Sequence, residues 1–182
     1  MHVTIVPSSP LNPSPPKTRG DFIWTDEAAC SAMASQCANA LRPLLAGGGS
    51  AVIELRGTLG AGKTTFTRHL LRALGVEGRV KSPSYAVVEP HEAPGLSIWH
   101  FDFYRFNDPQ EWEDAGFRDL FASPGLKLVE WPDKADGLLP TPDLIMTITP
   151  VDEDRREVRI ESGTLPGAQC LASLMQAGAP HA

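Results

Sequence analysis

The sequence predicts an α/β fold, in which helices flank a mixed β-sheet. Short apolar runs typical of buried strands are mixed with helical segments along the chain. A glycine-rich loop lies between one of these strands and the helix that follows it. A predicted hairpin requires some antiparallel members in the sheet.

The composition is that of a single globular domain. The chain has 182 residues, of which 42% are hydrophobic and 21% are charged. Sixteen Lys and Arg residues stand against 22 Asp and Glu, a net charge of −6, which disfavours a broad basic face for nucleic acid. No apolar run approaches the ~18 residues of a membrane-spanning helix, so we expect no membrane partner. Three cysteines without ligand-like spacing favour a reducing cytoplasm.

The chain is expected to divide into three parts. Residues 1–20 contain five prolines and little apolar surface, which predicts a disordered leader. Residues 21–162 carry the motifs and most of the predicted elements of the main domain. Residues 163–182 are expected to form a small C-terminal helix and a tail.

The elements of the first half are predicted from capping residues and apolar runs. Thr25 is a candidate N-cap, followed by two acidic residues, for a helix that reaches about Leu45 and ends at three glycines. Residues 51–55 form a short apolar run bounded by glycine-rich segments, which predicts a buried strand. A second helix is expected over residues 64–74, with Gly75 at its end.

The second half is predicted to contain most of the strands. Residues 85–88 and 96–103 flank a turn segment at 91–95 and predict a hairpin. Asp108 opens a capping box with proline at the first helical position, so we expect a short helix that ends at Gly116. Further strands are expected at residues 126–130, 144–149 and 156–160.

The glycine-rich loop carries the strongest motif of the chain. Residues 57–64 read Gly-Thr-Leu-Gly-Ala-Gly-Lys-Thr and fit the P-loop pattern G-x-x-x-x-G-K-[ST] at every fixed position. Glycines let successive backbone N–H groups point at phosphate oxygens, and the following helix adds the positive end of its dipole. Lys63 would reach the β- and γ-phosphates, and the Thr64 hydroxyl would bind Mg²⁺. Because a strand precedes the loop and a helix follows it, a nucleoside triphosphate site in a P-loop NTPase-like fold is favoured over a plain turn.

A P-loop enzyme also needs a carboxylate at the end of a neighbouring strand. Asp102 and Glu130 each close a predicted strand. Either could hold Mg²⁺ while the other orients the attacking water, and the residues alone leave both assignments open. His100, in the strand that Asp102 closes, has a position more typical of a structural than of a catalytic histidine.

Several other polar residues have both a functional and a structural interpretation. The segment 82–85 could sense a γ-phosphate or form a plain turn, and its candidate switch residues are Ser82, Ser84 and Tyr85. Arg105, which follows Tyr104, could stabilise phosphate charge or form a surface ion pair. Arg156 could stack on a base, pair with phosphate or remain solvated. Residues 133–136 match the guanine-binding N/T-K-x-D signature only in part, so we discount a GTPase.

Four motifs together resemble those of one family. They occupy residues 57–65, 81–85, 100–105 and 129–132, in the order and approximate spacing of the bacterial TsaE (YjeE) ATPases, which act in tRNA threonylcarbamoyladenosine synthesis. The resemblance covers about residues 22–160. Ser84 differs from the family pattern, because threonine is usual at that position.

The resemblance implies a P-loop fold with a mixed sheet and hydrolysis of ATP with Mg²⁺. It implies Thr64 and Glu130 as metal ligands, with Asp102 nearby as an acid that either supports those ligands or positions water. The candidate catalytic residues are therefore Lys63, Asp102 and Glu130. The implied ATP-binding residues are Gly57, Gly60, Ala61, Gly62, Lys63, Thr64, Thr65 and Arg156.

The resemblance also implies partners. The family works with TsaB and with TsaD, and TsaD modifies adenosine 37 of the tRNA, so this chain would meet tRNA indirectly. Two other functions stay open: a P-loop small-molecule kinase, although no arginine-rich lid is evident after Gly116, and a nucleotide-gated binding module without catalysis.

Overall fold

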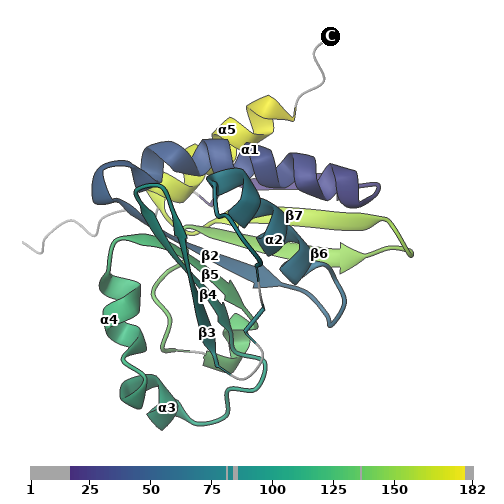
Figure 1. Ribbon diagram of the computed structural model, residues 1–182. Coiled ribbons are helices and arrows are strands. Elements are labelled where there is room, and N and C mark those ends of the chain that lie inside the picture. Colours follow the sequence, from purple (N-terminus) through teal and green to yellow (C-terminus); the bar gives the residue numbers. More distant parts are fainter. Residues whose placement is uncertain (1–16, 81, 84–85, 136, 179–182) are drawn as a thin grey trace, which may run out of the picture.

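The fold is a mixed α/β sheet with helices on both faces (Figure 1). The computed structural model describes residues 17–80, 82–83, 86–135 and 137–178. The helices are α1 (Glu27–Leu45), α2 (Lys63–Leu74), α3 (Pro109–Asp114), α4 (Phe117–Ala122) and α5 (Leu165–Ala177). The strands are β1 (Arg19–Trp24), β2 (Ser50–Arg56), β3 (Val88–Ala93), β4 (Leu96–Asp102), β5 (Gly125–Glu130), β6 (Leu144–Pro150) and β7 (Arg156–Ser162). The predicted fold class is confirmed.

The described strands form one seven-stranded sheet in the order β1-β7-β6-β2-β5-β4-β3. β2 is parallel to β5 and β6, and β5 is parallel to β4. The outer pairs β1–β7, β6–β7 and β3–β4 are antiparallel. Because β2, β5 and β4 run in the same direction, their carboxyl ends meet at one edge of the sheet, where ligands commonly bind in α/β folds.

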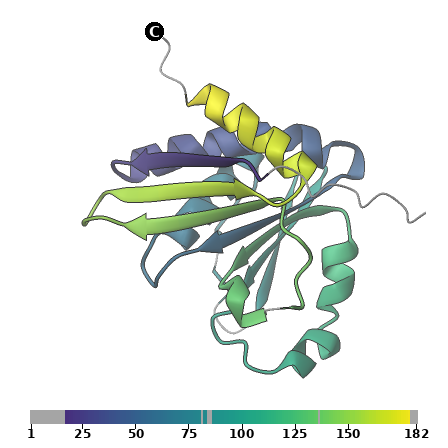
Figure 2. The ribbon, with the colours of Figure 1, turned by 180° about the vertical axis from the view of Figure 1, so that it is seen from behind.

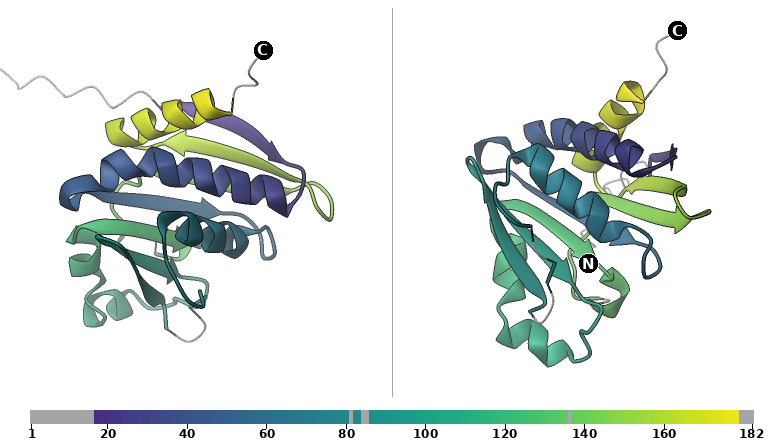
Figure 3. Two further views of the ribbon diagram at one scale, coloured as in Figure 1. Left: turned by 45° about the horizontal axis from the view of Figure 1, so that its top comes forward. Right: turned by 45° about the vertical axis from the view of Figure 1, so that its right-hand side comes forward.

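The two faces of the sheet are covered differently. α1, α2 and α5 lie over one face, where Phe66, Leu71 and Leu128 belong to the larger apolar core (Figure 3). α3 and α4 cover the β5-β4-β3 part of the opposite face, around an aromatic cluster that includes Phe101 and Trp112. On that face no helix of the described residues covers β1, β7 and β6 (Figure 2).

β1 was not predicted. It pairs antiparallel with β7 from Arg19 opposite Glu161 to Trp24 opposite Arg156, so Arg19 and Gly20, which the sequence assigned to the leader, belong to the sheet. Trp24 is buried and stacks on Phe66 of α2 with ring centroids 5.7 Å apart. Residues 1–16 of the predicted leader lie outside the described residues.

One predicted helix start was wrong, and one helix was not predicted. The N-cap of α1 is Asp26 rather than Thr25, because the Asp26 side chain accepts a hydrogen bond of 2.8 Å from the backbone N–H of Ala29. The helix expected to end at Gly116 is α3, which ends at Asp114, and a second short helix that was not predicted, α4, begins directly after Gly116. Gly116 lies between them with φ +67°, a left-handed conformation that interrupts the helical path.

The predicted hairpin is confirmed, but its first strand lies later in the chain than residues 85–88, because β3 begins only at Val88, and its turn is tighter than expected. β3 continues to Ala93 and β4 begins at Leu96, so Pro94 and Gly95 alone connect the strands. Gly95 has φ +70°, which glycine adopts without steric cost. Among the residues that the structure describes, no helix combines the length and the apolar character that crossing a bilayer requires.

Candidate functional site

The P-loop connects β2 to α2 at the carboxyl edge of the sheet. Gly57 has φ +151°, and a Cβ atom there would lie 2.6 Å from the carbonyl oxygen of Ile148 in β6, a close approach that only glycine allows. Gly60 and Gly62 have φ +78° and +109°. Gly62 is the N-cap of α2, so the loop delivers its curled backbone directly to the helix N-terminus, where unpaired N–H groups favour anions.

Lys63, the first residue of α2, turns back over the loop. Its Nζ donates hydrogen bonds to the carbonyl oxygens of Gly57 and Thr58 at 2.8 and 2.9 Å. The same ammonium lies 4.4 Å from the ring centroid of Trp131, a cation–π contact. Burial lowers the pKa of Lys63, and the charges of Glu130 and Asp102 oppose this shift. The ammonium is therefore held between the glycine loop and the end of β5.

Strand alternation brings Glu130 to the loop. Leu126 and Leu128 of β5 belong to the core under α2, so Glu130, two residues further, points to the same face at the strand end. Thr64 donates its hydroxyl to both carboxylate oxygens of Glu130, at 3.2 and 3.3 Å. Glu130 is 3% exposed, and its Oε1 lies 2.9 Å from Nε2 of His100.

Asp102 is placed opposite Glu130 by the parallel register of β4 and β5. It is half-buried, and its Oδ1 accepts a hydrogen bond of 3.0 Å from the backbone N–H of Tyr104. Burial raises the pKa of Asp102, the hydrogen bond from Tyr104 opposes that shift, and the charge of Glu130 adds to it. Two acids thus lie side by side at the edge of the sheet, next to Lys63.

These side chains line one pocket of about 230 Å³. Its lining consists of loop residues, strand-end acids and two aromatic side chains: Leu59, Gly60, Ala61, Gly62, Lys63, Thr64, Thr65, Asp102, Tyr104, Glu130 and Trp131. The rings of Tyr104 and Trp131 are 5.0 Å apart. Leu59 and Tyr104 are 77% and 46% exposed, so the wall nearest solvent is apolar.

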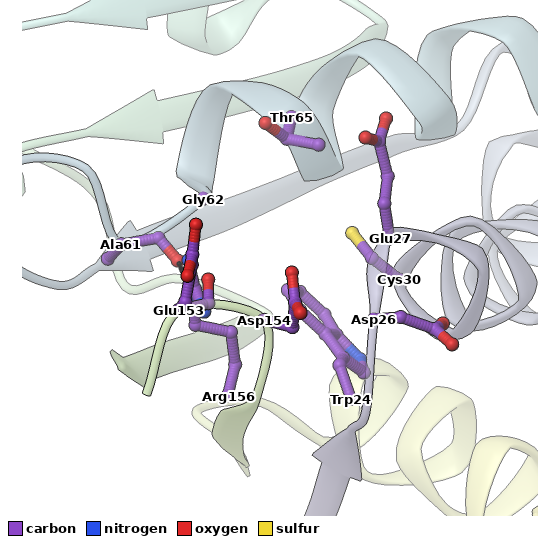
Figure 4. Close-up of a pocket in the computed structure, with 10 residues that line it drawn as sticks. All are labelled: Trp24, Asp26, Glu27, Cys30, Ala61, Gly62, Thr65, Glu153, Asp154 and Arg156. Carbon is purple, nitrogen blue, oxygen red and sulfur yellow. Dashed lines mark hydrogen bonds between the residues drawn. The ribbon is translucent and has the colours of Figure 1, made fainter. Parts of the chain in front are cut away.

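A second pocket, of about 190 Å³, adjoins the first along Ala61, Gly62 and Thr65. Figure 4 shows Trp24 and Cys30 on one side of it, Thr65 of α2 on another, and Arg156 with the acids Glu153 and Asp154 on a third.

Arg156 is tied to backbone carbonyls at this second pocket. Its Nε donates to the carbonyl oxygen of Ala61 at 3.0 Å, and its Nη1 donates to those of Asp152, Glu153 and Arg155 at 3.0 to 3.1 Å. The guanidinium therefore joins the segment between β6 and β7 to the P-loop.

Most of the predicted site residues meet in these two pockets. The loop residues, Asp102, Tyr104 and Glu130 line the first pocket, and Arg156 lines the second. Arg105 and Ser82 are exposed and line neither pocket. The candidate switch residues Ser84 and Tyr85 lie outside the described residues.

Sequence reasoning missed several contributors to the site. Trp24 required recognition of β1, for which the run of apolar residues from Phe22 to Trp24 was the available signal. Trp131 has φ +56°, a conformation that no local sequence signal predicts. His100 was interpreted as structural, although it contacts Glu130.

Comparisons with known proteins support the same arrangement. A family model described as "Threonylcarbamoyl adenosine biosynthesis protein TsaE" matches residues 24–158. The chain is 41% identical over 122 residues to "tRNA threonylcarbamoyladenosine biosynthesis protein TsaE" of Haemophilus influenzae, which covers 67% of this chain and 77% of that protein. It is 40% identical over 114 residues to the protein of the same description from Aquifex aeolicus, covering 62% of this chain and 77% of that one.

The crystal structure of Bacillus subtilis YdiB shares the fold. It matches with a TM-score of 0.71 and 24% sequence identity, over 91% of this chain and 100% of that chain. The family match spans the P-loop, both strand-end acids and Arg156, the residues that build the two pockets. The chain belongs to the TsaE family of threonylcarbamoyl adenosine biosynthesis proteins.

Proposed function

We propose that this chain binds ATP with Mg²⁺ at the P-loop and hydrolyses it, as a component of the machinery that forms N6-threonylcarbamoyladenosine in tRNA together with TsaB and TsaD. The observation that carries the proposal is the convergence of the loop with Thr64, Glu130 and Asp102 on one pocket. Family membership supports the pathway and the partners.

The phosphates would bind at the loop. Backbone N–H groups of the loop and of the first turn of α2 are donors for phosphate oxygens, because a helix N-terminus has no intrahelical acceptors for them. Lys63 already lies over the loop, bound to two carbonyl oxygens. We expect its ammonium to exchange these acceptors for the more strongly attracting β- and γ-phosphate oxygens.

The residues present fit Mg²⁺. The Thr64 hydroxyl and the Glu130 carboxylate face each other at 3.2 Å, and both are the hard oxygen ligands that this ion prefers. Thr64 and Glu130 would therefore hold the ion beside the phosphates. When bound, Mg²⁺ neutralises the charge that develops on the transferred phosphoryl group.

Asp102 would position the attacking water. Its carboxylate lies beside that of Glu130 in the sheet register and is anchored by the N–H of Tyr104. An acid fixed in this way can accept a hydrogen bond from water and orient the oxygen towards the γ-phosphate. Lys63 stabilises negative charge in the same step.

The second pocket would receive the nucleoside part of ATP. It begins where the loop enters α2, at Gly62 and Thr65, and continues between Trp24 and Arg156. An indole ring and a guanidinium plane both offer stacking surfaces to a base. The hydrogen bond from Arg156 to Ala61 keeps this wall in place relative to the phosphates.

The proposal is tested by measuring phosphate release from Mg–ATP, first with this chain alone and then with its cognate TsaB and TsaD. We expect slow release alone and a clear rise with both partners. Lys63→Ala should lower the stimulated rate by about 10²–10³-fold, because it removes a charge that acts on the transition state. Arg118→Ala, which removes an exposed cation of α4 outside both pockets, is the matched control.

Two results would contradict the proposal. An unchanged rate of ATP hydrolysis in Lys63→Ala would show that Lys63 of the P-loop takes no part in the reaction. Absence of any partner effect would withdraw the assignment to the complex and leave a P-loop nucleotide-binding protein.

One alternative is favoured by a specific observation. The exposed side chains of Leu59 and Tyr104 at the mouth of the phosphate pocket could form a partner contact that responds to bound nucleotide. Very slow turnover, combined with partner association that depends strongly on ATP, would indicate a nucleotide-gated binding module.

A further inference from the structure

His100 is a buried polar residue in the middle of β4. It is 1% exposed, and strand alternation places it on the same face as Ile98, which belongs to the apolar core under α2. Removing an imidazole from water is costly unless its nitrogen atoms find hydrogen-bond partners. The partners of this ring therefore indicate its role.

The ring makes a single side-chain hydrogen bond among the described residues. Nε2 lies 2.9 Å from Oε1 of Glu130. An ionised carboxylate can only accept, so Nε2 carries the proton and donates it. Nδ1 is buried and has no hydrogen-bond partner within the described part of the chain. The one directed contact of His100 is thus with a proposed metal ligand.

This contact fixes Glu130 from a second direction. The register pairs His100 with Leu128 and Asp102 with Glu130, so the ring reaches diagonally along the sheet towards the carboxyl edge. Oε1 of Glu130 is shared between Nε2 of His100 in β4 and Oγ1 of Thr64 in α2, at 2.9 and 3.2 Å. Two elements on different sides therefore define where the carboxylate lies.

We propose that His100 is the positioning residue of this site, holding the Glu130 carboxylate towards Thr64 so that the pair of oxygen ligands is preformed for Mg²⁺. The inference rests on the proposed function, since it requires Thr64 and Glu130 to bind the ion. Hydrogen-bond donors behind a ligating carboxylate orient it, and their loss typically weakens metal binding by about 10–100-fold. His100 itself need not touch nucleotide or metal.

The test is the Mg²⁺ dependence of ATP binding, measured by titration calorimetry on the full chain. Mg²⁺ should increase the affinity for ATP, and the Mg²⁺ concentration at half of this increase is the measured quantity. In His100→Leu this concentration should rise by about 10–100-fold, while the affinity for ATP without Mg²⁺ stays at the wild-type value. His100→Gln should recover most of the Mg²⁺ response, because a glutamine amide can place an N–H donor where Nε2 lies. The amide of His100→Asn reaches only the Nδ1 position, so this variant should resemble His100→Leu.

His91 provides the matched control. It lies on the neighbouring strand β3, and its Nε2 is also buried without a partner among the described residues. His91→Leu removes a buried ring nitrogen next to His100 that makes no hydrogen bond to Glu130 within the described part of the chain, and we expect the wild-type Mg²⁺ dependence.

The outcomes separate the two proposals. If the wild-type chain showed no ATP binding that Mg²⁺ strengthens, both would be overturned. Normal Mg²⁺ dependence in the wild type together with an unchanged His100→Leu would overturn the role of His100 alone. Should thermal unfolding show that His100→Leu does not fold, the comparison of His100→Gln with His100→Asn decides, and equal Mg²⁺ responses of those two would refute the inference.

Discussion

Lys127 and Glu130 are two buried charges on the same short strand, β5, and their surroundings differ. They are 0% and 3% exposed. Because they are three residues apart, they point to opposite faces of the sheet. Glu130 ends β5 at the carboxyl edge, next to the P-loop, whereas Lys127 lies nearer the beginning of the strand, on the face that α3 and α4 cover.

The Lys127 ammonium is bound by the protein itself. Nζ donates to Oγ of Ser50 at 2.9 Å and to the carbonyl oxygens of Ser123 and Gly125, and it lies 5.2 Å from the ring centroid of Trp99. Burial lowers the pKa of this lysine. These contacts join β2, the end of α4 and the start of β5, so the side chain has a structural role inside the fold.

Glu130 is held differently. Its oxygens accept from His100 and Thr64, and the carboxylate also lines a pocket that a ligand can enter. The comparison teaches that burial of a charge does not identify a functional site. The distinguishing feature is whether the buried group faces a pocket at a strand end or has its hydrogen bonds satisfied by the surrounding backbone.

The largest effect is expected for Glu130→Gln. The amide keeps the size of the side chain but removes the charge that would hold Mg²⁺, so we expect partner-stimulated phosphate release to fall by about 10²–10³-fold. The free energy of unfolding, measured by denaturant titration, should change by no more than about 1 kcal/mol. A wild-type hydrolysis rate in this variant would show that Glu130, like Lys127, has only a structural role.

Lys127→Ala should have the opposite profile. It opens a cavity and removes the Lys127 donor from the carbonyl oxygen of Ser123, while the carbonyl oxygen of Gly125 keeps its hydrogen bond from Ser50. We expect the change to cost about 2–4 kcal/mol of unfolding free energy. Hydrolysis per folded molecule should stay at the wild-type level. Loss of activity at a temperature where the variant is folded would contradict the structural role.

The pH dependence sharpens this contrast. Because burial lowers the pKa of Lys127, the folded state releases this proton at a lower pH than the unfolded state does. The wild-type chain should therefore gain stability, relative to Lys127→Ala, as pH rises from the lowered pKa towards the ordinary pKa of lysine. Denaturant titrations of both proteins across this alkaline range measure the difference, and parallel curves would show that the pKa of Lys127 is the same in the folded and unfolded states.

A smaller effect is expected for Gly57→Ala, which tests the loop that faces Glu130. The new Cβ atom would meet the carbonyl oxygen of Ile148 at 2.6 Å, and we expect a loss of about 1–3 kcal/mol in unfolding free energy. Gly60→Ala is the control, since φ there is +78° but no atom lies within 4 Å of the added Cβ. Equal losses in the two variants would show that the close approach to β6 is unimportant.

The smallest change in stability is expected for Asp102→Asn. Burial raises the pKa of Asp102 above its ordinary value, so the folded state binds this proton more tightly than the unfolded state, and the wild-type chain loses stability as pH rises through that range. The asparagine variant should therefore be equally stable or more stable near neutral pH. Its hydrolysis rate should fall, though less than in Glu130→Gln. A wild-type rate would show that Asp102 does not position the attacking water.

Much of the site was predictable because its residues are local in the chain. The glycines of the P-loop motif predict a curled backbone, and the segment that follows predicts a helix. The structure contains both. Asp102 and Glu130 could be named as strand-end acids from the apolar runs before them. That Asp102 and Glu130 are neighbours became clear only from the order of β4 and β5 in the sheet, which no local sequence pattern predicts.

The two missed elements, β1 and α4, have different causes. β1 is short and follows a proline-rich segment, so its pairing with β7 near the other end of the chain was not anticipated. Trp24 and Arg156 enter one pocket through that long-range pairing. Gly116 ends a helix as predicted, but α4, which begins directly after it, was missed because the sequence analysis considered this glycine only as a helix end.

Local signals in the sequence were enough to predict the fold class, the P-loop and the two strand-end acids, because glycine conformations, strand periodicity and helix capping act over a few residues. The tertiary structure decided that Thr64, Glu130 and His100 share one hydrogen-bonded cluster and that Lys127 does not belong to it. Strand order and register bring distant residues together, and those depend on how the whole apolar core is packed rather than on any local pattern.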